Sequence, residues 1–183
     1  MKKSLLFAAS LMLLFACSET GCTDNGKKTG DDMVDDMSHF VGMELVDIQE
    51  EGGEIPIKMW LPKVDKTGPR KVVFNGDFGR CEITAGKGFQ VNIYEAAEGE
   101  ENVDVFKTNP GLDIYTEKNF IIENDSTILF KGTNDHIEKD IYMFYAVVRA
   151  GNDTYIVENR ELVYFTQKEC EKMIRSAQDI RKL

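Results

Sequence analysis

The densest set of side chains that could bind a metal lies between Asp31 and His39, in the segment DDMVDDMSH. It combines four aspartates with Met33, Met37 and His39. Thioether and imidazole groups suit copper, whereas carboxylates suit calcium or magnesium. At helical spacing, however, the methionines and the aspartates point in different directions, so they form an apolar face and a solvated face. The pattern therefore predicts an amphipathic helix without a metal site.

Imidazole chemistry is limited to His39 and His136. A Ser/His/Asp hydrolase needs a nucleophilic serine beside one of them, and the sequence has no G-x-S-x-G nucleophile elbow. The run Gly86-Lys87-Gly88 lacks the spacing of a P-loop, and no GxGxxG motif precedes a predicted helix. We therefore expect no cofactor and assign no catalytic residue.

The 32 carboxylate side chains leave one enzymatic alternative open. Glycoside hydrolysis needs two carboxyl groups roughly 5 to 9.5 Å apart across a cleft, a separation that the sequence does not reveal. A deep pocket that holds two acids of raised pKa would favour a carboxylate-based hydrolase, whereas a flat aromatic sheet face would favour a binding protein.

The first seventeen residues have the layout of a secretory signal. Two lysines precede an apolar run from Leu5 to Ala16, which is shorter than the roughly 20 residues that a spanning helix needs. The run ends in Leu14-Phe15-Ala16-Cys17, which resembles the lipobox of bacterial lipoproteins. The resemblance implies cleavage before Cys17 and lipidation of that cysteine, and two or three acyl chains attach a protein durably. Ser18, where an aspartate would signal inner-membrane retention, favours the outer membrane.

The predicted mature chain is an acidic single domain on a tether. Removal of residues 1–16 leaves 167 residues and takes away two lysines, so the formal charge changes from -10 to -12. Residues 17–30 are typical of a flexible tether, and residues 31–183 have the length of one domain. The acidity argues against nucleic acid and against adhesion to anionic lipid, and it would suit a basic protein partner in the envelope.

Two amphipathic helices are expected at the ends of this domain. The first covers Asp31 to Asp47, where Met33, Met37, Val41 and Leu45 recur every four residues. The second covers Gln167 to Lys182 and begins with a capping box formed by Thr166 and Glu169. Its apolar side is formed by Cys170, Met173, Ile174, Ala177 and Ile180.

Between the two helices, apolar side chains mostly alternate with polar ones as in strands. The eight consecutive non-polar or aromatic residues from Ile141 to Val148 indicate a central strand that is covered on both faces. Turn signals such as Asn75-Gly76-Asp77 and Gly151-Asn152-Asp153 join neighbouring runs into hairpins. The predicted fold is therefore α+β, with an antiparallel sheet that is covered by an N-terminal helix and a C-terminal amphipathic helix. The expected strands lie at residues 55–61, 71–74, 81–84, 89–93, 120–123, 127–131, 141–148 and 154–157.

The segments IPIKMWLPK, VVFN and GKGFQVNIYE, followed by a strand pair and an amphipathic helix, resemble the Mog1/PsbP-type α/β/α sandwich in their order. The resemblance covers Ile55 to the C-terminus and rests on pattern, without a diagnostic motif. Because that family includes many bacterial lipoproteins of unassigned role, the resemblance implies a binding or accessory protein.

Cys81 and Cys170 both fall on predicted apolar faces. An exported chain can form disulfides, which makes a Cys81–Cys170 bridge one alternative. The other is a pair of buried free thiols, since unbonded cysteine is among the most buried residue types. The sequence does not decide between them.

Aromatic side chains gather in the last predicted strands, among them Tyr142, Tyr155 and Tyr164. If one sheet face is uncovered, tyrosines that point outward would form an interaction face, because tyrosine combines a large apolar ring with a polar group. The function expected is that of a membrane-anchored, non-enzymatic binding or accessory module in the cell envelope. The alternatives are the carboxylate hydrolase, an immunity- or inhibitor-type protein that blocks a basic toxin, and a structural envelope component.

Overall fold

Ten strands and few helices make up the part of the chain that the computed structural model describes, residues 37–108, 115–134, 137–161 and 163–183. The strands are Met43–Asp47 (β1), Ile57–Pro62 (β2), Arg70–Asn75 (β3), Arg80–Ala85 (β4), Gln90–Glu95 (β5), Glu117–Glu123 (β6), Thr127–Asn134 (β7), Ile137–Ala150 (β8), Asp153–Asn159 (β9) and Arg181–Lys182 (β10). The α-helices are Val64–Thr67 (α1), Asp104–Lys107 (α2) and Gln167–Gln178 (α3), with single helical turns at Met37–Phe40 (η1) and Gln49–Gly53 (η2).

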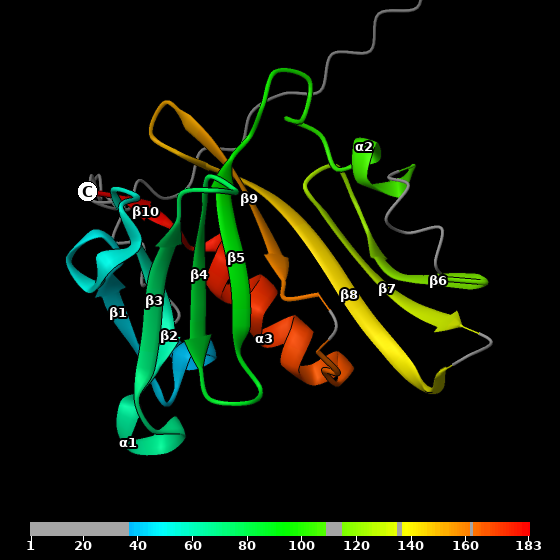
Figure 1. The fold of residues 1–183 in the computed structure, drawn as a ribbon, viewed down its shortest axis with the longest axis horizontal. Coiled ribbons are helices and arrows are strands. Elements are labelled where there is room, and N and C mark those ends of the chain that lie inside the picture. Colours follow the sequence, from blue (N-terminus) through cyan, green and yellow to red (C-terminus); the bar gives the residue numbers. More distant parts are fainter. Residues whose placement is uncertain (1–36, 109–114, 135–136, 162) are drawn as a thin grey trace, which may run out of the picture. The chain divides into compact units, whose positions relative to one another are not determined.

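The strands form two antiparallel sheets (Figure 1). The larger has seven strands in the order β3-β4-β5-β9-β8-β7-β6, and the smaller has three in the order β1-β2-β10. Most neighbouring strands follow each other in the chain, as the turn signals predicted, with β5 beside β9 as the exception in the larger sheet. The predicted α+β class with antiparallel strands is confirmed.

The predicted helix over Asp31–Asp47 is wrong in the half that the structure describes. Only η1 is helical there, and the chain then enters β1 through Gly42, whose φ of 80° lies in the left-handed region and ends the helical turn. Val41, expected on the buried side, is 83% exposed. Pairing with β2 satisfies the backbone polar groups of β1, so hydrogen bonding to a distant segment outweighs the local pattern.

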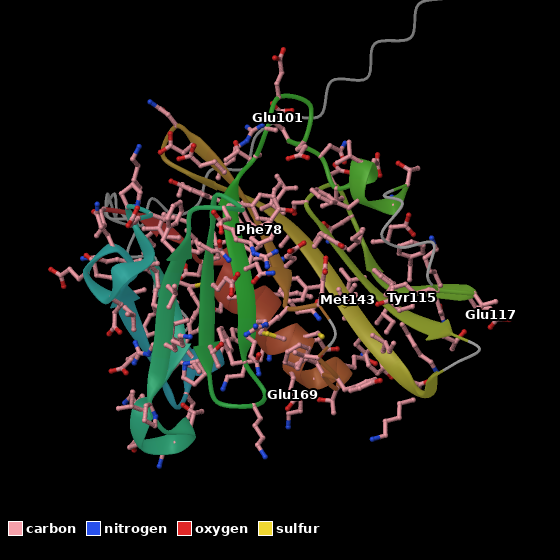
Figure 2. The ribbon with its side chains drawn as sticks, in the orientation of Figure 1. Phe78, Glu101, Tyr115, Glu117, Met143 and Glu169 are labelled. Carbon is pink, nitrogen blue, oxygen red and sulfur yellow. The ribbon has the colours of Figure 1, made fainter. Side chains whose placement is uncertain are left out.

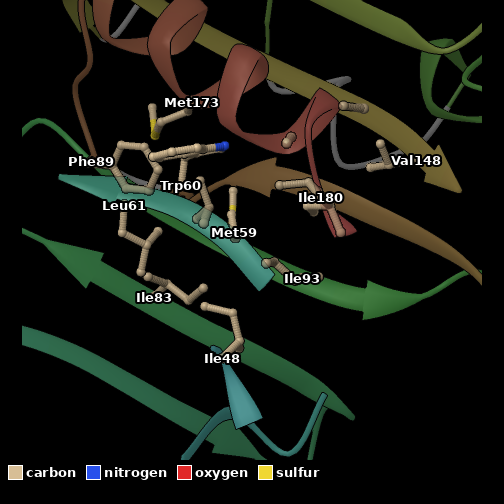
Figure 3. Packing of buried hydrophobic residues seen from close by; sticks show 14 of the residues in the cluster. Ile48, Met59, Trp60, Leu61, Ile83, Phe89, Ile93, Val148, Met173 and Ile180 are labelled. Atoms are coloured by element: carbon tan, nitrogen blue, oxygen red, sulfur yellow. The ribbon is translucent and has the colours of Figure 1, made fainter. Parts of the chain in front are cut away.

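One face of the seven-stranded sheet, here called the inner face, is covered by α3 and the small sheet. Figure 3 shows Met59 and Leu61 of β2 among Met173, Ile83 and Ile93, which belong to α3, β4 and β5. All five side chains are at most 1% exposed. The small sheet thus takes the covering position that the N-terminal helix was expected to occupy.

The C-terminal helix forms where the capping box predicted it. The Glu169 amide donates to Thr166 Oγ1 over 3.3 Å, and Glu169 Oε2 accepts a hydrogen bond from the Thr166 amide over 2.7 Å. The predicted apolar side is buried, but the helix ends at Gln178, and Arg181–Lys182 pairs with β2 instead of adding a last turn. Within the described ranges, no helix combines the length and the apolarity needed to cross a bilayer.

Candidate functional site

The opposite, outer face of the seven-stranded sheet has an apolar half and a polar half. In the apolar half, β7 and β8 contribute Ile128, Phe130, Met143 and Tyr145 to a second hydrophobic cluster. Side chains from the segment around α2, including Val103 and Phe106, and the ring of Tyr115 cover this cluster. Figure 2 shows Met143 and Tyr115 on that half, with Phe78 over the strands of the other half.

The polar half lies on β3, β4, β5 and β9, and the strand register arranges its side chains in rows. Glu82, Asn92 and Glu158 lie opposite one another in one row across β4, β5 and β9. Lys71, Thr84 and Gln90 form the adjacent row across β3, β4 and β5. Arg160 extends this second row, because its amide donates to the Gln90 carbonyl over 3.1 Å. We call these seven side chains, together with Asn75, the polar face.

A hollow of about 320 Å³ opens on the polar face. Its lining includes Lys71, Asn75, Asp77, Glu82, Thr84 and Arg160. Because successive residues of a strand point to opposite faces, the hollow is separated from the core by the sheet itself. Acidic and basic side chains thus line the same hollow, although the chain as a whole is acidic.

Glu82 is held in place and in its charged form by its neighbours. Asn75 Nδ2 donates to Glu82 Oε1 over 3.0 Å, and Arg80 Nε donates to the same oxygen over 3.2 Å. The hydrogen bond from Asn75, with further contributions from Arg80 and Arg160, lowers the pKa of the Glu82 carboxyl below its ordinary value. Glu82 is thus a preoriented acceptor at the hollow.

Glu158 stands in the same row but in the opposite environment. It is 6% exposed, and Asn92 Nδ2 donates to its Oε1 over 3.1 Å. Burial raises the pKa of the Glu158 carboxyl, and the hydrogen bond from Asn92 opposes that rise only in part. Asn92 Oδ1, also buried, has no hydrogen-bond donor among the described residues.

Lys71 and Arg160 are exposed, and neither forms an ion pair with any residue that the structure describes. This contrasts with Arg80, which contacts Glu82, and with Arg70, which is paired with Glu44 and Glu51 at another surface. Both cationic groups remain available to a ligand in the hollow.

The structure does not bring the three predicted tyrosines together. Tyr155 is fully buried on the inner face, and Tyr142 is half-buried against the same core, so the predicted tyrosine face is wrong for both. The register of β8 and β9 turns both rings toward the inner core beside α3. Tyr164 is 55% exposed outside the strands, with the Lys139 ammonium 5.8 Å from its ring.

The other predicted sites are resolved only in part. Cys81 and Cys170 are both buried and free. Of the two alternatives, the structure therefore shows free thiols and not a Cys81–Cys170 disulfide. Burial raises the pKa of each thiol to about 12. Cys17, the tether and the aspartates of Asp31–Asp36 lie outside the described residues, as does His136. Among the residues described, no group of three or more His, Cys, Asp or Glu side chains could hold a metal ion.

The sequence contained a signal for the polar face that strand alternation alone could have identified. Asn92 and Glu158 are polar residues inside the otherwise apolar runs VNIY and YIVE. Buried polar groups need partners, so two such positions in strands indicate a shared hydrogen bond. Their adjacency depends on the pairing of β5 with β9, which joins segments far apart in the chain.

Comparison with known proteins found no matching family model, no matching curated protein and no matching solved structure. The resemblance to the Mog1/PsbP-type sandwich therefore stays a prediction.

Proposed function

We propose that this chain is an exported lipoprotein, anchored through acyl chains on Cys17, whose folded domain is a non-enzymatic binding module in the cell envelope. The lipobox supports the lipid anchor. The acidic composition of the domain supports a body that does not adhere to anionic lipid. We also propose that the domain has the Mog1/PsbP-type architecture and that the protein is anchored in the outer membrane.

The observation that carries the binding role is the open part of the polar half, where the hollow lies, whereas Asn92 and Glu158 in the same half are buried. The apolar half of the outer face is covered by the segment around α2. The polar half has a hollow of about 320 Å³ instead. Glu82 is held by two hydrogen bonds, so little entropy of this side chain is lost on binding. We propose the polar face as the ligand surface, in place of the tyrosine face.

The hydrolase alternative has one supporting observation, the opposite pKa shifts of Glu82 and Glu158 in one row. Their Cα atoms are two strands apart, a separation of about 10 Å. However, Glu158 is 6% exposed and does not line the hollow. Of these two carboxyl groups only Glu82 lines the hollow, so a substrate there would not contact the pair together, which favours binding over hydrolysis.

The experiment compares capture of envelope components by three forms of the native lipidated protein: wild type, Thr84→Trp and Arg149→Trp. Thr84 lines the hollow, so an indole there fills it, whereas Arg149 is an exposed residue of β8 away from the hollow. We expect Thr84→Trp to lose a ligand that wild type and Arg149→Trp retain. Equal capture by all three forms would overturn the polar face as the binding surface.

The anchor is tested separately with Cys17→Ala. We expect the wild type to pellet with membranes and to incorporate labelled palmitate, and Cys17→Ala to do neither. If Cys17→Ala still pelleted as the wild type does, the lipoprotein proposal would be wrong.

A further inference from the structure

Two cations and one oriented carboxylate surround the hollow in a definite arrangement. Lys71 and Arg160 stand at the two ends of one row, with Thr84 and Gln90 between them. Side chains of lysine and arginine are long enough to lean inward over the shorter residues of the row. Both line the same hollow, so their charges act on the same volume.

The adjacent row offers hydrogen-bond acceptors. Glu82 lines the hollow and keeps its negative charge there, whereas its neighbour Asn92 in the same row is 1% exposed and lies beneath the surface. The two rows are two residues apart along the strands, which corresponds to a separation of roughly 7 Å. The polar face therefore has a cationic row beside an accepting row.

We propose that the hollow binds a small ligand with a carboxylate or another oxyanion at one end and a hydrogen-bond-donating ammonium or hydroxyl group roughly 7 Å away. The inference rests on the proposed function and adds the chemistry of the ligand. The oxyanion lies between Lys71 and Arg160, where a guanidinium provides two parallel donors, and Thr84 lines the same volume. The donor group binds Glu82.

Charge balance separates this occupant from a polyanion. Glu82 and Asp77 also line the hollow, and the whole chain has a formal charge of -10, so an extended polyanion would meet repulsion around the two cations. A basic protein surface, in turn, would meet Lys71 and Arg160 at the centre of the contact. A ligand with both an anionic and a donating end satisfies Lys71, Arg160 and Glu82 together.

The probe is 6-aminohexanoate, whose extended chain separates a carboxylate from an ammonium by a comparable distance. Titration into the isotope-labelled full chain is followed through backbone amide chemical shifts. We expect saturable shifts in β3–β5, and at least about tenfold weaker binding of hexanoate and of hexylamine, since each lacks one charged contact. Absence of saturable shifts in these strands would overturn the proposal, as would equal binding of all three compounds.

Four variants assign the contacts. We expect Lys71→Met and Arg160→Met each to weaken the probe about tenfold while hexylamine binding is unchanged, and Glu82→Gln to weaken the probe and hexylamine but not hexanoate. Arg149→Met is the matched control, an exposed cation on the same sheet but outside the hollow. Thermal unfolding of each variant checks that the domain remains folded.

The failure of this inference is distinguishable from failure of the proposed function. If Thr84→Trp abolishes capture of an envelope ligand while Lys71→Met and Arg160→Met retain it, the polar face is a binding surface for a ligand of different chemistry. If Thr84→Trp changes nothing, the binding surface itself is wrong.

Discussion

Asn92 and Glu158 stand directly opposite each other on β5 and β9, and the Asn92 amide donates to the Glu158 carboxyl over 3.1 Å. The pair lies at the boundary between the two halves of the outer face, because Glu158 also lies opposite Tyr145 of the apolar half. Although Asn92 and Tyr94 both hydrogen-bond to it, this buried carboxyl is incompletely compensated when ionised, because both donors are neutral. The protonation of Glu158 should therefore be coupled to the stability of the whole domain.

Glu158→Gln is expected to gain stability over the wild type as the pH rises. Because the folded-state pKa of Glu158 is raised, its stabilising contribution is complete below its ordinary value of 4.5 and is lost as the pH rises through the folded-state pKa. The difference in unfolding free energy between variant and wild type should grow by at most about 1.4 kcal/mol per pH unit. Urea unfolding from pH 4 to pH 8 measures it, with the exposed Glu98→Gln controlling for the charge change. A difference that is independent of pH would contradict the raised pKa.

Asn92→Asp replaces the amide that donates to Glu158 Oε1 by a second carboxyl group. Two facing carboxylates repel each other, so we expect a loss of unfolding free energy on the order of 3 kcal/mol at neutral pH, most of it recovered in acid. Chemical unfolding at neutral and acidic pH measures both values. Asn152→Asp, at an exposed turn, is the matched control and should lose little. Equal losses at both positions would show that the Asn92–Glu158 contact is not made.

Cys81 and Cys170 should be unreactive in the folded protein. Thiolates are the nucleophiles, and burial raises the pKa of both thiols to about 12, so alkylation at neutral pH should be negligible until the domain unfolds. The measurement uses a Cys17→Ala, Cys22→Ala variant without reductant, with alkylation counted by mass before and after denaturation. Two alkylated thiols are expected after denaturation. If the two thiols of the denatured chain were alkylated only after a reductant is added, the protein would contain a Cys81–Cys170 disulfide and the prediction would be wrong.

Gly53→Ala is expected to destabilise the contact between η2 and β4. An added Cβ would lie 2.8 Å from Cys81 Sγ and 2.8 Å from the Ile48 carbonyl oxygen, and it would also meet Ile48 Cγ2. We expect a loss of about 1 to 3 kcal/mol of unfolding free energy. Gly76→Ala is the control, because nothing lies within 4 Å of its added Cβ. Similar midpoints for both variants in thermal unfolding would count against the close packing of η2.

Local patterns predicted the elements that depend on local physics. Alternation of apolar and polar residues located β2 and β5, short runs beside turn signals located β3, β4, β6, β7 and β9, and the continuous apolar run Ile141–Val148 located β8. The Thr166 capping box located α3. These signals suffice because each reflects which side of one element is buried. The Asp31–Asp47 helix failed at Gly42 and β1, where pairing with β2 decided the structure. The segment that forms β1 contains apolar residues spaced by four, as in a helix, so its sequence does not distinguish a helix from a short strand until the pairing partner is known.

The sequence predicted the strands that contribute to the candidate site, but not which of their side chains come together. Lys71, Glu82 and Thr84 are ordinary outward residues of predicted strands, and nothing local separates them from other exposed polar side chains. Asn92 joins them through the β4–β5 pairing, but Glu158 and Arg160 join them only because β9 lies beside β5. The tyrosine face was wrong for another non-local reason, since the side on which α3 packs decides which ring is buried.

The pairing of β2 with β10 sets an order of events for a chain that is made or translocated from its N-terminus. β2 is among the first segments to emerge, yet its second neighbour is Arg181–Lys182, and Trp60 Nε1 donates to Asp179, 119 positions away. Until those residues arrive, β2 lacks one strand partner and the helix that packs on it. Contacts of such long range form late in folding. The inner layer therefore closes only when α3 and β10 have been synthesised.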